Sequence, residues 1–282
     1  MANELDTGNS AGELFENITQ AAQFTMNENA LLRNLVTVYD MQGTPGLTAS
    51  VPVWPRVTGL SALSAGADLS NTDIAATAVD ITAAEYGAMT TIQDIVIESS
   101  PIAVAQDAGS VLGGGVAQAM DEVIVDLFAS ASTDVGPGAG AELTMDHLLK
   151  AAATLRANSV PMSGLVAVLS PAAAYNLKKT LVNAGGSLSN NDLANAAARD
   201  YYLGTISGIS IYESASIDIS GVDAVSAVFH PAAIGMVMKR DLRIATQRDE
   251  SIRGFEIVSS AAFGSAILDQ AKIVKMTSES TV

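Results

Sequence analysis

Two histidines, His147 and His230, are the side chains of this sequence best suited to acid–base chemistry near neutral pH. A serine hydrolase would place one of them beside a nucleophilic serine on a G-x-S-x-G elbow between a strand and a helix, and no elbow of that kind is predicted here. His147 falls at a predicted helix start, and His230 precedes Pro231. We therefore expect a helix cap and a turn residue, with no catalytic role for either.

Acidic side chains could supply a second kind of chemistry. Asp68, Asp73 and Asp80 could bind a cation, but they lack the glycine and the terminal glutamate of a calcium-binding loop. The chain has no cysteine, which excludes disulfides, thiolate metal sites and cysteine nucleophiles. We expect no metal site, no cofactor and no enzymatic activity from these residues.

One basic cluster stands out in the second half of the chain. It comprises Lys239, Arg240, Arg243, Arg248 and Arg253. Three acidic residues lie between its members, which favours salt bridges within or between subunits over a nucleic-acid surface. The cluster is a candidate assembly contact.

The only tryptophan, Trp54, lies in the short segment Pro52-Val53-Trp54-Pro55-Arg56. Tryptophan is enriched at the binding hot spots of protein interfaces, so Pro52, Trp54, Pro55 and Arg56 are further candidate contacts with another subunit. Packing at the base of a hairpin is the alternative for Trp54. Because proline has no N–H to donate, the two prolines restrict this segment to an edge strand or an isolated hairpin.

The segment Ser100–Ser130 predicts a single long helix, around which the rest of the chain, including the candidate residues above, is expected to be organised. Its apolar residues recur at helical spacing, at Ala105, Ala108, Leu112, Val116, Ala119, Val123 and Leu127. This pattern predicts one amphipathic helix about 45 Å long. Asp121, Glu122 and Asp126 fall on its other face, where they could pair for acid–base work, although we expect a solvated helix face.

Three consecutive glycines, Gly113, Gly114 and Gly115, interrupt this helix. A phosphate-binding loop would follow a strand and include a lysine followed by serine or threonine, and that sequence is absent. Each glycine weakens a helix by about 1 kcal/mol relative to alanine. We therefore expect a position where the helix bends or packs closely against a neighbour.

Charge is distributed unevenly along the 282 residues, and the formal net charge is −16. Residues 1–147 carry 19 acidic residues against two basic ones, Arg33 and Arg56, whereas residues 148–282 carry 11 against 12. An acidic chain gains no counterion-release energy from DNA, so tight DNA binding is not expected. The uncharged segment Ala157–Leu177 is interrupted by prolines, and we expect no membrane span.

The remaining elements follow from local patterns. Glu13–Tyr39 predicts a helical arm, and Leu47–Val57 and Val79–Val96 predict the two strands of a projecting hairpin. A lone hairpin is marginal in water, so a neighbouring molecule should receive it. An α/β region is expected next, with helices from Thr144 to about Asn158, from Ser170 and over Asp192–Arg199, and strands at Leu165–Leu169 and Gly204–Tyr212. Later strands are expected at Val225–Phe229, Ile234–Met238, Leu242–Ala245, Phe255–Ile267 and Ala271–Met276.

This order of elements resembles the major capsid proteins of tailed bacteriophages (Caudoviricetes), whose Hong Kong 97 fold encapsulins share. The resemblance covers nearly the whole chain. Its local support is Leu165–Pro171 leading into a helix, the sequence Gly204–Ile211, and the ending Phe255–Met276 with Ala271-Lys272-Ile273-Val274. These are patterns of element order and polarity, with no catalytic motif among them.

The resemblance implies an α+β chain with an N-terminal arm, an extended β-hairpin loop, a long spine helix and an α/β axial domain. The implied boundaries are 1–46 for the arm, 47–98 for the extended loop, 99–143 with 224–282 for the peripheral domain that contains the spine helix, and 144–223 for the axial domain. The implied function is structural. Subunits assemble in the host cytoplasm as hexamers and pentamers, forming the icosahedral capsid of a virion that encloses double-stranded DNA without binding it tightly.

Two departures from some family members bear on the partners. Only about 45 residues precede the hairpin, so a separate scaffolding protein or an already processed chain is implied, together with a portal. The hairpin has no lysine, and the first in the chain is Lys150, which excludes a lysine-to-asparagine cross-link and implies noncovalent contacts or a separate cement (decoration) protein. In this setting Gly113–Gly115 would let the spine helix bend between immature and expanded shells.

Other functions remain open at this point. An encapsulin nanocompartment would use the same fold and load a cargo enzyme. A soluble enzyme of Ala/Gly-rich α/β type would have a site not recognised here, and its sign would be a stable, active monomer. A secreted surface array is disfavoured because no secretion signal is predicted.

Overall fold

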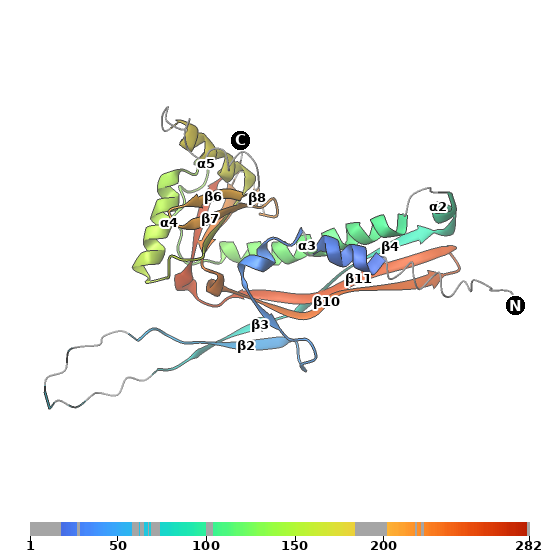
Figure 1. Ribbon diagram of the computed structural model, residues 1–282, viewed down its shortest axis with the longest axis horizontal. Coiled ribbons are helices and arrows are strands. Elements are labelled where there is room, and N and C mark those ends of the chain that lie inside the picture. The colour runs from blue at the N-terminus through green and yellow to red at the C-terminus, as the bar shows by residue number, and fades with distance from the viewer. Residues whose placement is uncertain are drawn as a thin grey trace.

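A helix packed along a narrow sheet and a second, wider α/β lobe make up the body of the protein, and a long hairpin projects from it (Figure 1). The computed structural model describes residues 18–26, 29–57, 62, 65–66, 68, 74–99, 104–183, 202–217, 219–220 and 223–280. The mixed helix and sheet content confirms the predicted α+β class.

The smaller sheet has four strands in the order β1-β10-β11-β4. Their bounds are Thr37–Asp40 for β1, Ala84–Gln93 for β4, Ile234–Asp249 for β10 and Gly254–Ile267 for β11. β1 is parallel to β10, and the other two pairings are antiparallel. The spine helix α3, Val104–Ala129, lies along this sheet. Met120, Ile124 and Phe128 of α3 are fully buried in the core between helix and sheet.

The larger sheet has the order β12-β9-β5-β7-β6, with β8 paired to β9. Its strands are β5 (Leu165–Leu169), β6 (Tyr202–Ile206), β7 (Ile209–Glu213), β8 (Ile219–Ser220), β9 (Asp223–Phe229) and β12 (Ile273–Glu279). All five residues of β5 are buried, because Val166 and Val168 face the core beside α3 and the other three residues face a second core beside helices α4 (Met145–Ala157) and α5 (Pro171–Asn183). These two helices contribute Leu148 and Leu177 to the second core.

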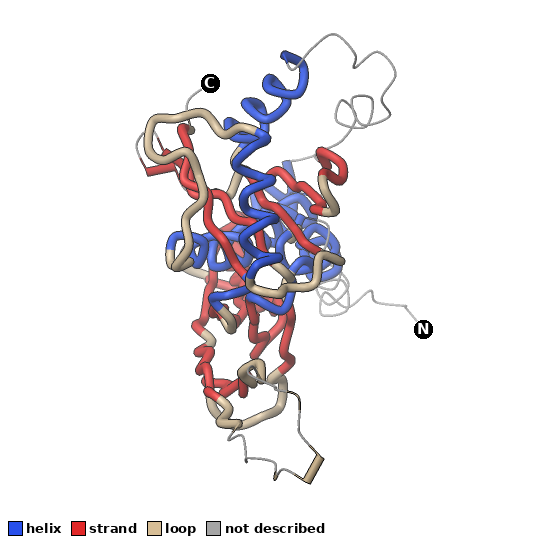
Figure 2. The backbone as a smooth tube through the Cα atoms, turned by 90° about the vertical axis from the view of Figure 1, so that its left-hand side faces the viewer, coloured by secondary structure: helices blue, strands red, loops and turns tan. Residues whose placement is uncertain are grey.

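The projecting hairpin pairs β2 (Thr48–Val53) with β3 (Thr77–Thr82) in antiparallel register. Figure 2 shows it extending away from the helices of the body. Its base is anchored by Ile81, which is buried with Met41, Ala83 and Val237. Pro52 lies opposite Ala78 in this two-stranded pair, where its missing N–H interrupts no wider sheet.

Residues 18–26 of the arm are helical, and four further short helices lie in the described structure. They are η1 (Leu32–Leu35), α2 (Asp94–Ser99), η3 (Pro231–Ala233) and η4 (Gln270–Lys272). The chain crosses between the two lobes at η3 and again at η4. The two crossings are joined by backbone hydrogen bonds, from Leu268 N to Ala233 O at 2.7 Å and from His230 N to Lys272 O at 3.1 Å.

Several predicted elements have different limits in the structure. The expected run Val79–Val96 divides, because β3 pairs with β2 whereas β4 enters the smaller sheet, and α2 follows where a strand was expected. The two expected strands Ile234–Met238 and Leu242–Ala245 form one strand, β10, which β-bulges allow to continue past Met238. Gly204–Tyr212 was expected as one strand but contains a hairpin, with positive φ at Ser207 and Gly208 as a two-residue turn requires.

The predicted grouping of residues 224–282 with the spine helix also needs correction. β9 and β12 pair with each other, and β9 pairs with β5, so both belong to the larger sheet. The intervening β10 and β11 belong to the smaller sheet, while β9 and β12 also contact the spine helix from the larger sheet. The predicted helix Asp192–Arg199 lies outside the described residues, as do the first residues of the arm and most of the hairpin tip.

Candidate assembly surfaces

Trp54 borders a groove at the base of the projecting hairpin. The groove has a volume of about 410 Å³, and Val53, Trp54, Pro55 and Arg56 form one side of it. Trp54 is 66% exposed, so packing at the hairpin base covers only a minor part of this residue. Pro52, Pro55 and Arg56 are exposed as well. The segment predicted from sequence therefore forms an accessible, partly apolar surface.

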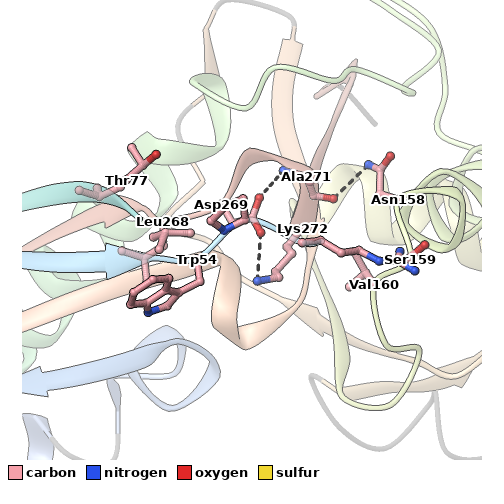
Figure 3. Close-up of a pocket in the computed structure, with 13 residues that line it drawn as sticks. Trp54, Thr77, Asn158, Ser159, Val160, Leu268, Asp269, Ala271 and Lys272 are labelled. Atoms are coloured by element: carbon pink, nitrogen blue, oxygen red, sulfur yellow. Dashed lines mark hydrogen bonds and ion pairs between the residues drawn. The ribbon is translucent and has the colours of Figure 1, made fainter. Parts of the chain in front are cut away.

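The opposite side of this groove comes from distant parts of the chain, as Figure 3 shows. The turn after α4 contributes Asn158, and the crossing at η4 contributes Asp269 and Lys272. Lys272 Nζ lies 3.0 Å from Asp269 Oδ2, and Asn158 Nδ2 donates to the Ala271 carbonyl at 3.1 Å. No sequence signal connects these residues with Trp54, since only the fold brings them together.

Arg248, in the basic cluster, is fully engaged within the chain. Its guanidinium donates two hydrogen bonds to the carboxylate of Asp94, at 3.0 and 2.8 Å, and one to Glu250 at 2.8 Å. Its Cζ also lies 4.8 Å from the ring centre of Phe255. The hydrogen bonds from Arg248 lower the pKa of Asp94, and the two carboxylates raise the pKa of Arg248. This arginine joins β10 to the start of α2.

The other members of the cluster divide into two kinds. Lys239 donates to the Met41 and Thr44 carbonyls and so holds the turn after β1, while Arg240 forms an ion pair with Glu85 at 2.9 Å. Arg243 and Arg253 are exposed and form no ion pair with any other described residue. Of the five basic residues, these two are available for contacts with another molecule.

The arm packs directly on the spine helix at two glycines. Residues 18–26 are helical and lie beside α3 (Figure 1). A β-carbon added at Gly109 would lie only 2.7 Å from the carbonyl oxygen of Ile18. At Gly113 it would lie 2.8 Å from the Cα of Ala22, whereas Gly115 faces open space. Close packing thus explains Gly113. α3 is a single helix through all three glycines, and bending there remains a prediction.

Asp121 was expected on a solvated helix face and is instead buried, with 5% of its surface exposed. Its Oδ1 accepts a hydrogen bond from the backbone N–H of Leu32 at 3.1 Å. Burial raises the pKa of Asp121 to about 6, although the N–H groups of Leu32 and Leu31 lower it. Glu122 and Asp126 are exposed as predicted.

His147 caps a helix as predicted, whereas His230, expected as a turn residue, is the N-cap of the short helix η3. His147 Nδ1 accepts from the Thr144 N–H at 3.3 Å in a capping box at the start of α4. His230 Nδ1 accepts from the Ala232 N–H at 3.1 Å at the start of η3, and its pKa is lowered by burial and by Lys272.

Neither a metal centre nor a membrane helix emerges from the described part of the chain. No three histidine, aspartate or glutamate side chains are grouped there as ligands of a metal ion. Asp80 lies on β3, and Asp73 falls outside the described residues. The helices described here include none that is long and apolar enough to span a bilayer.

Comparison with known proteins gives one family and a set of similar structures. The phage capsid protein family matches residues 76–276, more than half of the chain. No curated protein sequence matches the chain significantly.

Three of the similar structures illustrate the range of sequence identity and TM-score. A structure from Mycobacterium phage Che8 has 22% sequence identity and a TM-score of 0.68, covering 88% of this chain and 90% of that one. The capsid of cyanophage P-SCSP1u has 17% identity and a TM-score of 0.70, covering 88% of each chain. A virus-like particle from Pyrococcus furiosus has 12% identity and a TM-score of 0.63, covering 93% of this chain and 98% of that one.

Proposed function

This chain belongs to the phage capsid protein family and has a Hong Kong 97-type fold, and we propose that it forms the hexamers and pentamers of an icosahedral shell around the double-stranded DNA of a tailed bacteriophage. As a capsid protein it is a component of the virion. Assembly in the host cytoplasm, on a separate scaffolding protein and around a portal, is part of the proposal.

The projecting hairpin is the observation that carries this proposal. β2 and β3 pair only with each other in the described structure, and an isolated two-stranded hairpin is marginal in water. The chain nevertheless keeps an exposed tryptophan at the base of this hairpin, beside a groove. A neighbouring subunit that covers Trp54 would remove this apolar surface from water and support both strands.

The charge of the subunit suits a container for DNA. With a net charge of −16, the chain as a whole repels nucleic acid, and two of the five residues in its basic cluster are committed to ion pairs with Glu85 and with Asp94 and Glu250. A shell that bound DNA tightly would hinder the movement of DNA during packaging. We therefore propose enclosure without specific DNA contacts, and noncovalent or cement-protein contacts between subunits.

A cellular nanocompartment that loads a cargo enzyme is the second candidate of the same fold. The similarity to the Pyrococcus furiosus virus-like particle supports a shared fold at 12% identity. The family match favours the phage capsid. Shells that retain a host enzyme through purification would favour the nanocompartment.

The test is electron microscopy and size-exclusion chromatography of the chain expressed alone and with a candidate scaffolding protein. We expect capsomer rings or closed shells, and we expect Trp54→Ala to reduce assembly while leaving the circular dichroism of the subunit unchanged. Trp54→Phe, which keeps an aromatic ring, should assemble better than Trp54→Ala. Val111→Ala is a matched control on the exposed surface of α3, and it should assemble normally. A monodisperse, enzymatically active monomer under both conditions would overturn the proposal.

A further inference from the structure

The N-terminal arm is held on the spine helix by two separate contacts. The first is the close helix crossing at Gly109 and Gly113, where Ile18 and Ala22 are fully buried. The second lies further along α3, where Asp121 binds η1. Between them the arm buries Met26 and Leu32 in the main core. Detaching the arm would therefore expose the side of α3 that faces the arm, together with Asp121.

Asp121 performs a capping role that the arm cannot perform for itself. The N-cap residue of η1 is Leu31, which has no side-chain oxygen to accept from the first N–H groups of the helix. The carboxylate of Asp121 accepts from Leu32 N instead, across 89 positions of the sequence. A carboxylate buried for this purpose costs free energy when it is ionised, because it has lost most of its water.

Among the residues that the structure describes, no charged side chain forms an ion pair with Asp121 to compensate for this burial. Asp107, Glu122 and Asp126 share α3 with Asp121, and Glu122 is hydrogen-bonded to Gln118. The charged residues of the described elements packed against α3 are Arg33 on η1, Glu85 on β4, Asp94 and Glu98 on α2, Asp223 on β9, Lys239, Arg240, Asp241, Arg243, Arg248 and Asp249 on β10, Glu256 on β11, and Lys275 and Glu279 on β12. The pKa of Asp121 is raised by burial and lowered only by the N–H groups of Leu32 and Leu31.

We propose that Asp121 is a proton-operated latch, which holds the arm on the spine helix more tightly when it is protonated and less tightly when it is ionised. The direction follows from linkage. The docked arm gives Asp121 a pKa of about 6, against 3.8 when it is free in water, so the docked state binds the proton more tightly. Docking is strengthened as the pH falls from 7 towards 4 and is weakened as it rises again. For these pKa values, the docking equilibrium changes about tenfold between pH 7 and pH 5.

The consequence for assembly rests on the proposed function, whereas the latch itself does not. In a shell subunit, release of the arm towards a neighbour would be easier at neutral pH than at acidic pH. Acid treatment would therefore hold the arms on their own spine helices. The two statements are tested separately, because arm docking can be measured whether or not shells form.

The absence of cysteine makes arm docking measurable with single thiols. Met26→Cys places a thiol at a buried position of the arm, and Gln23→Cys places one at an exposed position of the same helix. The rate of reaction of each with dithiodipyridine is measured from pH 7 to pH 5. The ratio of exposed to buried rate cancels the pH dependence of the thiol itself and reports how tightly the arm is docked.

With Asp121 present, we expect this ratio to rise about tenfold from pH 7 to pH 5. Asp121→Asn keeps an oxygen for Leu32 N but cannot ionise, so its ratio should be independent of pH and should exceed the parent ratio at pH 7. Asp121→Ala removes the acceptor and should lower the ratio at both pH values. A flat ratio in the parent, or an unchanged pH dependence in Asp121→Asn, would overturn the latch.

Hydrogen exchange at the Leu32 amide, corrected for the intrinsic exchange rate at each pH, gives the same answer if Met26→Cys fails to fold. Electron microscopy of the same samples separates the two proposals. Shells with a flat ratio would overturn the latch and leave the capsid function standing. A pH-dependent ratio without shells or capsomers would support the latch and count against the proposed assembly.

Discussion

Gly113 of the spine helix lies against the backbone of Ala22 with no space between them, since a β-carbon at position 113 would lie 2.8 Å from the Ala22 Cα. Gly113→Ala should therefore force the arm away from α3. Overpacking of this kind costs about 1–3 kcal/mol, which outweighs the gain of about 1 kcal/mol from replacing glycine in a helix. Gly115→Ala is the matched control, because its β-carbon would meet nothing within 4 Å. In urea unfolding we expect Gly113→Ala to destabilise and Gly115→Ala to stabilise. Equal gains from both would contradict close packing at Gly113.

Gly114 allows the bending of the spine helix to be tested without a steric clash. A β-carbon there would meet only Asn29 Nδ2 at 3.9 Å and Thr25 Cγ2 at 4.0 Å, which are ordinary contacts. If the helix bends at the glycines when shells expand, Gly114→Ala should stiffen it and slow expansion. Shell diameter over time by electron microscopy is the measurement. Expansion at the parent rate would remove the case for a bend at this position.

Arg248 and Arg243 lie on the same strand and should respond differently to removal. Arg248→Ala breaks the bonds to Asp94 and Glu250 and the contact with Phe255, so the subunit should unfold at a lower temperature, and added salt should narrow the difference from the parent. Arg243→Ala should leave the unfolding temperature unchanged and reduce assembly yield, because Arg243 forms no ion pair with another described residue. A large loss of subunit stability in Arg243→Ala would show that its role lies within the chain.

His230 should make stability depend on pH through the crossing between the two lobes. Burial and Lys272 lower its pKa below 6.5, so the unfolded chain takes up the proton first as the pH falls. This contribution to stability is complete above pH 6.5 and is lost as the pH falls below it. His230→Asn keeps an oxygen that can accept from Ala232 N, and it should remove that loss. The measurement is the unfolding midpoint of His230→Asn and of the parent from pH 8 to pH 5. The difference between the two proteins isolates the effect of His230, because Asp121 contributes equally to the pH dependence of each. An identical pH dependence in the two proteins would contradict it.

Much of the fold could be predicted because local patterns agree with it. The helical spacing around Leu112 and Val116, the cap at Thr144 and the apolar strand Leu165–Leu169 each specify an element on their own. The prolines at positions 52 and 55 correctly indicated a strand outside any wide sheet.

The errors arise where a distant segment decides the outcome. Residues 239–243 have a polar interruption that predicts a strand end, but pairing with β11 carries β10 through it. The turn at Ser207 and Gly208 needs a positive φ angle at both residues. The sequence indicates this only at Gly208, because glycine adopts positive φ readily and serine does not.

Asp121 shows, for a single side chain, that contacts with a distant segment cannot be predicted from the local sequence. An aspartate beside Glu122 on an amphipathic helix has the pattern of a solvated face. It is buried where η1 packs against α3 and the Leu32 N–H donates to it, and nothing in the sequence around position 121 indicates this contact with the arm. Likewise, Trp54 was a recognisable candidate contact, whereas Asn158 and Lys272 across the groove were not.

The parallel pairing of β1 with β10 constrains the order in which a newly synthesised chain can fold. Thr37 pairs with Gly235 and Asp40 pairs with Met238, so β1 has no sheet partner until all of β2 to β9 has left the ribosome. The helix formed by residues 18–26 has to wait only for α3. Contacts between such distant segments slow folding. The arm can therefore pack against the spine helix early in synthesis. β1, which follows the arm, stays unpaired until β10 has been synthesised and completes the smaller sheet.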